Sequence, residues 1–163
     1  MYLKDLKCRI LYEYNDAFSA LLIQYKELCD EALYPVFLSP DAEKLKKRYR
    51  GYTLVCPPSS EKKRRERGFD HVEKMFSVLS LPILSPFYKV DDFSQKKGGK
   101  IARQHVGTHI RLQQDAQLPE TPILLIDDVV TSGNTLLSCY ELLKKEGREI
   151  EALCVSGSHT YFE

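Results

Sequence analysis

The sequence predicts an α/β fold of three layers, in which a central, mostly parallel sheet is flanked by helices. Apolar runs of strand length alternate along the chain with segments whose apolar residues recur at helical spacing. Residues 123–126 are apolar at every position, as expected of a parallel strand that is covered on both faces. Because 163 residues can bury one core, residues 1–163 are expected to form a single domain.

The N-terminal segment, residues 1–50, is predicted to contain a strand and a helix followed by a charged tail. Residues 8–14 alternate apolar and polar side chains, which is typical of a strand. Residues 15–28 begin with an asparagine, a good helix cap, and continue with apolar residues at helical spacing. The Ser-Pro pair at residues 39–40 indicates the start of another helix, with Pro at the first helical position.

The middle of the chain is predicted to continue this alternation. Residues 52–56 have the composition of a short strand, which is left through a Pro-Pro-Ser turn at residues 57–59. Residues 69–79 place apolar side chains on one face of an amphipathic helix, and residues 83–88 are expected to be extended. Residues 91–107 are polar and lack apolar periodicity, so we expect them to form a mobile loop.

The last third of the chain is predicted to contain three strands and one helix. Residues 109–112 and 149–155 are predicted to be strands that flank the central strand at residues 123–126. Apolar residues at helical spacing over residues 136–143 predict a helix that ends before Gly147.

Two adjacent carboxylates, Asp127 and Asp128, directly follow the apolar run of the central strand. In open α/β sheets ligands bind in the crevice outside the carboxyl ends of the strands, so these side chains are expected to face a binding cleft. Carboxylates at this place are good acceptors for the vicinal hydroxyl groups of a pentose. We therefore expect both residues to hold ribose hydroxyls, directly or through water.

A loop of small residues follows the carboxylates and opens the next helix. Unpaired backbone N–H groups, the positive end of the helix dipole and three hydroxyl groups can surround a phosphate dianion there. A ligand with ribose hydroxyls at one end and a phosphoryl group at the other points to phosphoribosyl pyrophosphate. The expected ligand-binding residues of this loop are Val129, Val130, Thr131, Ser132, Gly133, Asn134 and Thr135.

Each part of this pattern has a simpler explanation on its own. A strand of any Rossmann-like domain can end in Asp, and a Ser or Thr after it can be a plain helix cap. The combination of strand, acidic pair and Thr-Ser-Gly-x-Thr is much rarer and favours a phosphoribosyl pyrophosphate loop. A nucleotide triphosphatase would need a Gly-x-x-x-x-Gly-Lys-Ser/Thr loop, which the sequence lacks.

Composition narrows the class of protein. The sequence has no apolar run near the roughly 18 residues of a membrane span and no signal-peptide pattern at its start, so we expect a cytoplasmic protein. Its five cysteines are odd in number and nowhere arranged as Cys-x-x-Cys, which argues against a disulfide framework and against a zinc site. We expect buried thiols and no metal-ligating side chains.

Positive charge is concentrated in one segment, although the net charge is only +1. Residues 44–67 contain ten Lys or Arg side chains against two acidic ones. Such a cluster is usually a solvated surface, but this one follows a predicted strand near the ligand-binding end of the sheet. With aromatic residues interleaved, it could contact pyrophosphate or the backbone of single-stranded DNA. The candidate nucleic-acid residues are Lys62, Lys63, Arg64, Arg65 and Arg67.

Three segments resemble the ComF family, proteins of the type I phosphoribosyltransferase fold that are associated with bacterial competence and transformation. These are residues 15–26, residues 64–70 and residues 126–135. The last segment is common to type I phosphoribosyltransferases, whereas the Arg-Glu-Arg-Gly-Phe part of the second narrows the resemblance to ComF-like proteins. Most members begin with a four-cysteine zinc module, and this chain is expected to lack that module.

The resemblance implies a type I phosphoribosyltransferase-like fold and a set of roles. The turn formed by Pro57, Pro58 and Ser59 would face pyrophosphate, and Mg²⁺ would bind together with phosphoribosyl pyrophosphate. Catalysis would depend on Asp127, Asp128 and Arg103. The candidates for contact with the leaving pyrophosphate are Lys96, Lys97, Lys100 and Arg103, with Arg64, Arg65 and Arg67 as second choices.

Three functions stay open at this point. The resemblance implies a competence protein that binds phosphoribosyl pyrophosphate and handles incoming single-stranded DNA, with helicase or recombination proteins as partners. The second possibility is a salvage phosphoribosyltransferase that acts on a free nucleobase. The third is a ligand-sensing regulator that keeps the fold without the chemistry. The basic segment favours the first possibility over the second, and the sequence names no acceptor pocket.

Overall fold

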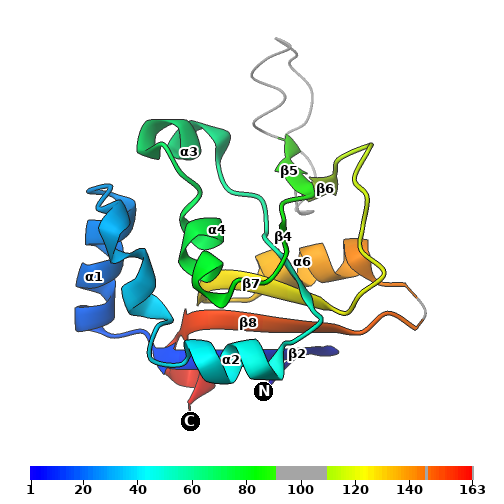
Figure 1. The fold of residues 1–163 in the computed structure, drawn as a ribbon, viewed down its shortest axis with the longest axis horizontal. Coiled ribbons are helices and arrows are strands. Elements are labelled where there is room, and N and C mark those ends of the chain that lie inside the picture. Colours follow the sequence, from blue (N-terminus) through cyan, green and yellow to red (C-terminus); the bar gives the residue numbers. More distant parts are fainter. Residues whose placement is uncertain (91–109, 146, 163) are drawn as a thin grey trace.

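A six-stranded sheet forms the centre of the protein, which confirms the predicted fold class (Figure 1). The computed structural model describes residues 1–90, 110–145 and 147–162. The strand order is β1-β2-β8-β7-β3-β4, and every pair of neighbours is parallel except β1 with β2. The strands are β1 (Tyr2–Leu3), β2 (Leu6–Glu13), β3 (Thr53–Val55), β4 (Ile83–Leu84), β7 (Ile123–Val130) and β8 (Ile150–Gly157).

Helices cover both faces of this sheet and complete the three layers (Figure 1). On one face α1, α2 and α4 pack against strand residues that include Leu124 and Ile126. On the other face α6 packs against residues that include Ile123 and Leu125. All four of these β7 side chains are fully buried, as the unbroken apolar run predicts. The helices are α1 (Asp16–Lys26), α2 (Ala42–Arg48), α3 (Glu61–Arg67), α4 (His71–Phe76) and α6 (Asn134–Leu143), with 3₁₀ turns at Glu31–Phe37, Ser77–Leu79 and His159–Tyr161.

The predicted strand and helix at the N-terminus are confirmed as β2 and α1. The Asn15 side chain caps α1 by accepting a hydrogen bond of 2.9 Å from the Phe18 N–H. The next α-helix begins later than the pair Ser39 and Pro40 predicts, because the chain first makes a turn and α2 starts at Ala42. The strands predicted at residues 52–56 and 149–155 are confirmed as β3 and β8.

One predicted strand has a partner other than the expected one. β6 (Ile110–Leu112) pairs antiparallel with β5 (Phe87–Lys89) in a separate two-stranded sheet. The prediction that this run flanks the central strand is therefore wrong, since β3 and β8 are the neighbours of β7. A short apolar run predicts extended backbone but not its partner, and antiparallel pairing needs no crossover helix. The loop predicted at residues 91–107 lies outside the described residues.

The last part of the basic segment forms a helix, α3, which apolar periodicity does not predict because none of its residues is buried. The helix is held by its ends. Ser60 caps the start by accepting a hydrogen bond from the Lys63 N–H at 3.4 Å, and Gly68 ends the helix with a φ of 85°. Arg65 adds an ion pair to Glu61, one turn earlier. Figure 1 shows α3 standing away from the sheet, towards the same side of the view as β5 and β6.

Candidate functional site

A cavity of about 330 Å³ lies at the carboxyl ends of β3 and β7. The turn after β3, the last residue of α1, the starts of α4 and α6 and Asp127 of β7 meet around it. The cavity therefore unites residues predicted from separate motifs. From the predicted ligand set it is lined by Pro57, Pro58, Ser59, Asp127 and Thr135.

The two adjacent carboxylates lie in different surroundings. β7 continues through them to Val130, so their side chains alternate as in any strand. Asp127 is half-buried and lines the cavity, where a ligand hydroxyl can reach its carboxylate. Asp128 is only 6% exposed, and its Oδ1 accepts the Val129 N–H at 2.7 Å. The geometry therefore favours Asp127 for direct contact with ribose, and the same role for Asp128 stays a prediction.

Asp128 is the centre of a chain of charged and polar side chains. Its Oδ2 accepts hydrogen bonds from Lys26 Nζ at 2.7 Å and from His71 Nε2 at 3.1 Å. The other ring nitrogen of His71, Nδ1, lies 2.9 Å from Arg67 Nη1. Because a guanidinium group only donates, Nδ1 must accept and the ring proton lies on Nε2. His71 therefore bridges the Arg67 guanidinium group and the Asp128 carboxylate through its two ring nitrogens.

These surroundings move the pKa values of the two carboxyl groups in opposite directions. Burial alone would raise the pKa of Asp128, but the His71 hydrogen bond and the Lys26 ammonium hold it well below its usual range. Burial and the adjacent charge of Asp128 raise the pKa of Asp127. Asp127 is therefore the carboxyl group that gains most from a hydroxyl donor or a cation in the cavity.

The turn between β7 and α6 has the backbone geometry expected of a phosphate site. Gly133 has a φ of 71°, and a Cβ atom at this position would lie 3.0 Å from Leu3 Cδ1, so a side chain is disfavoured. As the N-cap of α6, Gly133 has no side chain that could occupy the N–H groups of the first turn. Exposed hydroxyl groups surround the turn on Thr131, Ser132 and Thr135.

The Pro-Pro-Ser turn at residues 57–59 is fixed against α4. The Ser59 hydroxyl donates a hydrogen bond of 2.5 Å to Asp70 Oδ2, while Asp70 Oδ1 accepts the Val72 N–H at 3.1 Å and caps α4. One carboxylate therefore holds both the turn and the helix that carries His71. This arrangement places the turn rigidly beside the cavity.

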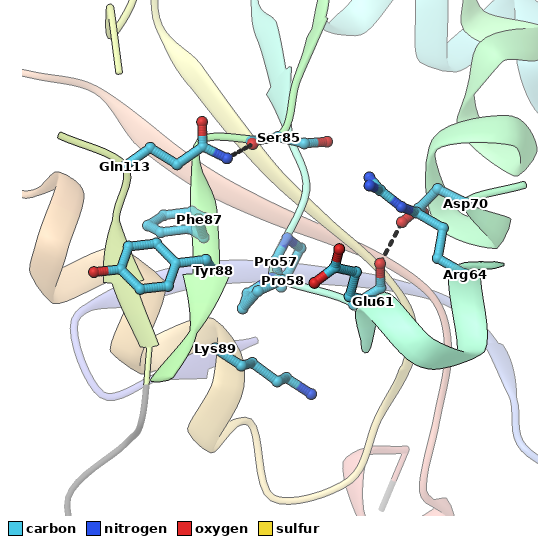
Figure 2. A pocket seen from close by; sticks show the side chains of 11 residues that line it. Pro57, Pro58, Glu61, Arg64, Asp70, Ser85, Phe87, Tyr88, Lys89 and Gln113 are labelled. Carbon is cyan, nitrogen blue, oxygen red and sulfur yellow. Dashed lines mark hydrogen bonds between the residues drawn. The ribbon is translucent and has the colours of Figure 1, made fainter. Parts of the chain in front are cut away.

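A second cavity, of about 210 Å³, is also lined by this turn (Figure 2). Figure 2 shows Phe87 and Tyr88 of β5 on one side of it and Arg64 of α3 on the other. Lys89 and the turn line both cavities. The two cavities therefore share the turn and one cation.

Cationic side chains gather around the first cavity, where an anion would need them. Lys26, Lys63, Arg67 and Lys89 all line it. Two of the predicted nucleic-acid residues thus face the ligand cavity, and Arg64 lines the second cavity. The remaining two lie on the exposed face of α3, where Lys62 and Arg65 pair with Glu66 and Glu61 of the same helix.

Some of the predicted residues cannot be placed, and some residues at the site were not predicted from the sequence. Lys100 and Arg103 lie outside the described residues. The sequence reading missed Lys26 and His71, which contact Asp128 from far away in the chain. A signal was present for both, because Lys26 ends the first segment that resembles the ComF family and His71 follows the second directly.

The side chains that line the cavity determine how Mg²⁺ could be held there. Within residues 1–90, 110–145 and 147–162, no group of three or more His, Cys, Asp or Glu side chains could hold a metal ion. One carboxylate in the cavity, that of Asp127, nevertheless fits an ion that keeps most of its water and takes its other oxygens from a phosphorylated ligand.

None of the helices in the described part of the chain is long and apolar enough to span a membrane.

Comparison with known proteins finds similarity to competence proteins. No family model matches the sequence. The chain is 30% identical over 141 residues to "Competence protein ComFC" of Streptococcus pneumoniae (strain ATCC BAA-255 / R6), which covers 85% of this chain and 62% of that protein. It is 28% identical over 142 residues to "Competence protein ComFC" of Bacillus subtilis (strain 168), with 86% and 59% covered. The chain is therefore ComF-like over most of its own length.

Other similarities of this ComF-like chain are to phosphoribosyltransferases. It is 26% identical over 113 residues to "Adenine phosphoribosyltransferase" of Campylobacter jejuni, which covers 68% of this chain and 59% of that protein. A crystal structure of adenine phosphoribosyltransferase from Rhodothermus marinus matches 77% of each chain with 17% identity and a TM-score of 0.41. The chain spans only 59% to 62% of the length of these curated relatives.

Proposed function

We propose that this ComF-like protein binds phosphoribosyl pyrophosphate in the 330 Å³ cavity. The observation that supports it most is the meeting of Asp127, Thr135 and the 57–59 turn around one cavity that cations also line. A single ligand with hydroxyls, a monophosphate and a pyrophosphate would satisfy all of these groups. The similarity to an adenine phosphoribosyltransferase agrees with such a ligand.

Each part of the cavity suits one part of this ligand. The 5-phosphate would lie on the N–H groups at the start of α6, among the hydroxyls of residues 131–135. The Asp127 carboxylate would accept hydrogen bonds from ribose hydroxyls. The pyrophosphate would lie between the 57–59 turn and the cations Lys63, Arg67 and Lys89. Bound Mg²⁺ would neutralise part of the pyrophosphate charge, with Asp127 as its side-chain contact in the described part of the cavity.

Transfer of the phosphoribosyl group would require more than binding. Positive charge develops on the ribose as pyrophosphate leaves, so the site must stabilise the leaving group and exclude water. The cavity cations provide the first of these requirements. Lys100 and Arg103 are proposed to add to the leaving-group contacts, on the strength of the family resemblance. An acceptor is the remaining requirement, and chemistry therefore depends on a second substrate.

Phosphoribosyl pyrophosphate with Mg²⁺ is expected to raise the melting temperature of the protein. A ligand that binds only the folded state, present at 100 times its Kd, stabilises it by about 2.7 kcal/mol. For a chain of this size that corresponds to a shift of roughly 5 °C or more. Differential scanning fluorimetry measures the shift, and calorimetry gives the affinity. Inorganic sulfate at the same ionic strength is the control, and an equal shift with sulfate would contradict specific binding.

We further propose a role in competence through the handling of single-stranded DNA along α3, as the names of the ComFC relatives suggest. α3 carries five Lys or Arg side chains against two Glu and has no buried residue. Its position next to the ligand cavities would place a DNA backbone beside the bound sugar phosphate. Helicase or recombination proteins are the proposed partners in that role.

Replacing Arg64 and Arg65 together by Ser is expected to weaken binding of a labelled oligonucleotide and to flatten its salt dependence. Each lost phosphate contact reduces the slope of log K against log salt by about 0.7 for single strands. Fluorescence anisotropy over a salt series measures both quantities. The double substitution of Lys44 and Lys47 by Ser, on α2, removes the same charge elsewhere and is expected to change little. Equal losses in the two double variants would indicate diffuse attraction rather than a site on α3.

A salvage phosphoribosyltransferase is the alternative that the adenine phosphoribosyltransferase relative supports. Such an enzyme would release pyrophosphate when adenine or another nucleobase is added to the protein with phosphoribosyl pyrophosphate. A regulator would bind the ligand and release none. A pyrophosphate-release assay over a panel of nucleobases therefore separates the salvage enzyme from the other two functions, and the oligonucleotide titration separates a regulator from a DNA-binding protein.

A further inference from the structure

Lys26 is a cation with unused hydrogen-bonding capacity at the wall of the ligand cavity. It is the last residue of α1, where the helix dipole favours a positive charge. Its side chain is 25% exposed, and its Nζ donates one hydrogen bond, to Asp128 Oδ2 at 2.7 Å. An ammonium group has three donors. Among the described residues no second partner of Nζ is found, so two donors can serve a ligand in the cavity.

Three other elements hold this ammonium group in place. Asp128 of β7 fixes the charge directly, and His71 of α4 holds the same carboxylate oxygen at 3.1 Å. Arg67, the last residue of α3, contacts His71 Nδ1 and donates a second hydrogen bond, of 2.8 Å, from Nε to the Lys26 carbonyl oxygen. Tyr25 supports the arrangement by donating a hydrogen bond of 2.8 Å to the His71 carbonyl oxygen.

We propose that Lys26 binds the pyrophosphate end of the ligand, and that Asp128, His71 and Arg67 position Lys26 for this contact. The assignment rests on the proposed binding of phosphoribosyl pyrophosphate and deepens it. Lys26 shares the cavity with the 57–59 turn and with the cations Lys63, Arg67 and Lys89. Asp128 then acts through Lys26, whereas Asp127 faces the ligand itself.

A purely structural pairing explains the observations less well. Buried ion pairs contribute little net stability, because desolvation of the charges offsets their attraction. The protein also contains an equally short but more exposed pair away from the cavity, Lys7 with Glu151 at 2.6 Å, on neighbouring strands β2 and β8. In the described part of the chain, the Glu151 carboxylate of that pair has one further ion-pair partner, Arg48 at 4.0 Å, and no series of short hydrogen bonds like the one through His71 and Arg67. The extra hydrogen bonds around Lys26 indicate that the orientation of its ammonium group matters.

The test compares two ligands, phosphoribosyl pyrophosphate and ribose 5-phosphate, by calorimetry in the presence of Mg²⁺. The ratio of their affinities isolates the contribution of the pyrophosphate. Lys26→Gln is expected to weaken phosphoribosyl pyrophosphate binding by roughly tenfold or more, the loss of one charge-assisted contact, and to leave ribose 5-phosphate affinity nearly unchanged. Asp128→Asn and His71→Leu are expected to shift the ratio in the same direction.

Conservative and distant variants provide the controls. Lys26→Arg keeps the charge and is expected to restore most of the ratio, and His71→Gln keeps a donor towards Asp128 and should do likewise. Lys7→Gln removes the equally short ion pair outside the cavity and should leave both affinities unchanged. Asp127→Asn is expected to weaken ribose 5-phosphate itself. Thermal melts identify any variant that does not fold, and Asp128→Asn carries the test if Lys26→Gln is such a variant.

The outcomes separate this inference from the proposed function. If the parent protein binds neither ligand, the proposed function fails and the assignment of Lys26 fails with it. If the parent binds both ligands and Lys26→Gln leaves their ratio unchanged, only the assignment of Lys26 is overturned. An equal loss for both ligands in Lys26→Gln, with normal folding, also overturns it, because Lys26 would then act on the ribose phosphate rather than on the pyrophosphate.

Discussion

Gly133→Ala is expected to weaken phosphoribosyl pyrophosphate binding by at least roughly tenfold and to lower stability by about 1 to 2 kcal/mol. The stability loss comes from the left-handed backbone, with a φ of 71°, that an alanine must adopt. The affinity loss comes from displacement of the turn, because the added Cβ would lie 3.0 Å from Leu3 Cδ1 and the N–H groups at the start of α6 would shift. Calorimetry and thermal melts measure the two effects.

Gly51 offers a matched control for this substitution. It has a φ of 86°, and a Cβ atom at this position would meet nothing within 4 Å. Gly51→Ala is therefore expected to cost similar stability but to leave ligand affinity unchanged, because it lies in the turn before β3. If the two variants lost affinity equally, the loss at Gly133 would reflect general destabilisation and not a phosphate site.

Asp128→Leu is expected to lower the free energy of unfolding by about 3 kcal/mol at neutral pH. The substitution removes a buried carboxylate and leaves Lys26 and His71 without their acceptor. Glu31→Leu is the comparison, since Glu31 forms an equally short ion pair with Lys74, at 2.6 Å, in an exposed place. Exposed pairs contribute little, so Glu31→Leu should change stability only slightly. Urea denaturation of the three proteins measures the differences.

The stability gap between the parent protein and Asp128→Leu is also expected to depend on pH. The pKa of Asp128 in the folded protein lies below its usual value of 3.8. A carboxyl group with a lowered folded-state pKa adds stability that is fully present above its unfolded value and is lost as the pH falls towards the folded one. The gap should therefore be constant from pH 7 to pH 5 and should narrow below about pH 4. A gap that widened in acid would contradict the ion pair.

The sequence predicts this fold well where hydrophobic patterning decides the structure. Residues 123–126 have to be covered on both faces, so their place in the sheet follows from their composition. It predicts α3 poorly, because a helix that buries nothing depends on Ser60, Gly68 and charge pairs rather than on apolar periodicity. It also fails for the partner of β6, since strand pairing depends on chain connections as well as on local composition.

The residues of the candidate site also differ in how well the sequence predicts them. Asp127 and the phosphate turn are contiguous in sequence, so one motif predicts them together. Lys26 and His71 approach Asp128 across separations of 102 and 57 residues, and only the tertiary packing of α1 and α4 on β7 brings them there. The motif therefore predicts two equivalent carboxylates, whereas the folded chain gives Asp127 to the cavity and surrounds Asp128 with protein donors.

A crystal structure with ribose 5-phosphate tests the central claim, that the turn before α6 binds a phosphate while Asp127 binds the pentose. We expect the phosphate within hydrogen-bond distance of the backbone N–H groups of residues 132–136, and at least one ribose hydroxyl within reach of the Asp127 carboxylate. A structure obtained at saturating ligand in which the turn binds nothing, or in which the ribose lies away from Asp127, would contradict the account.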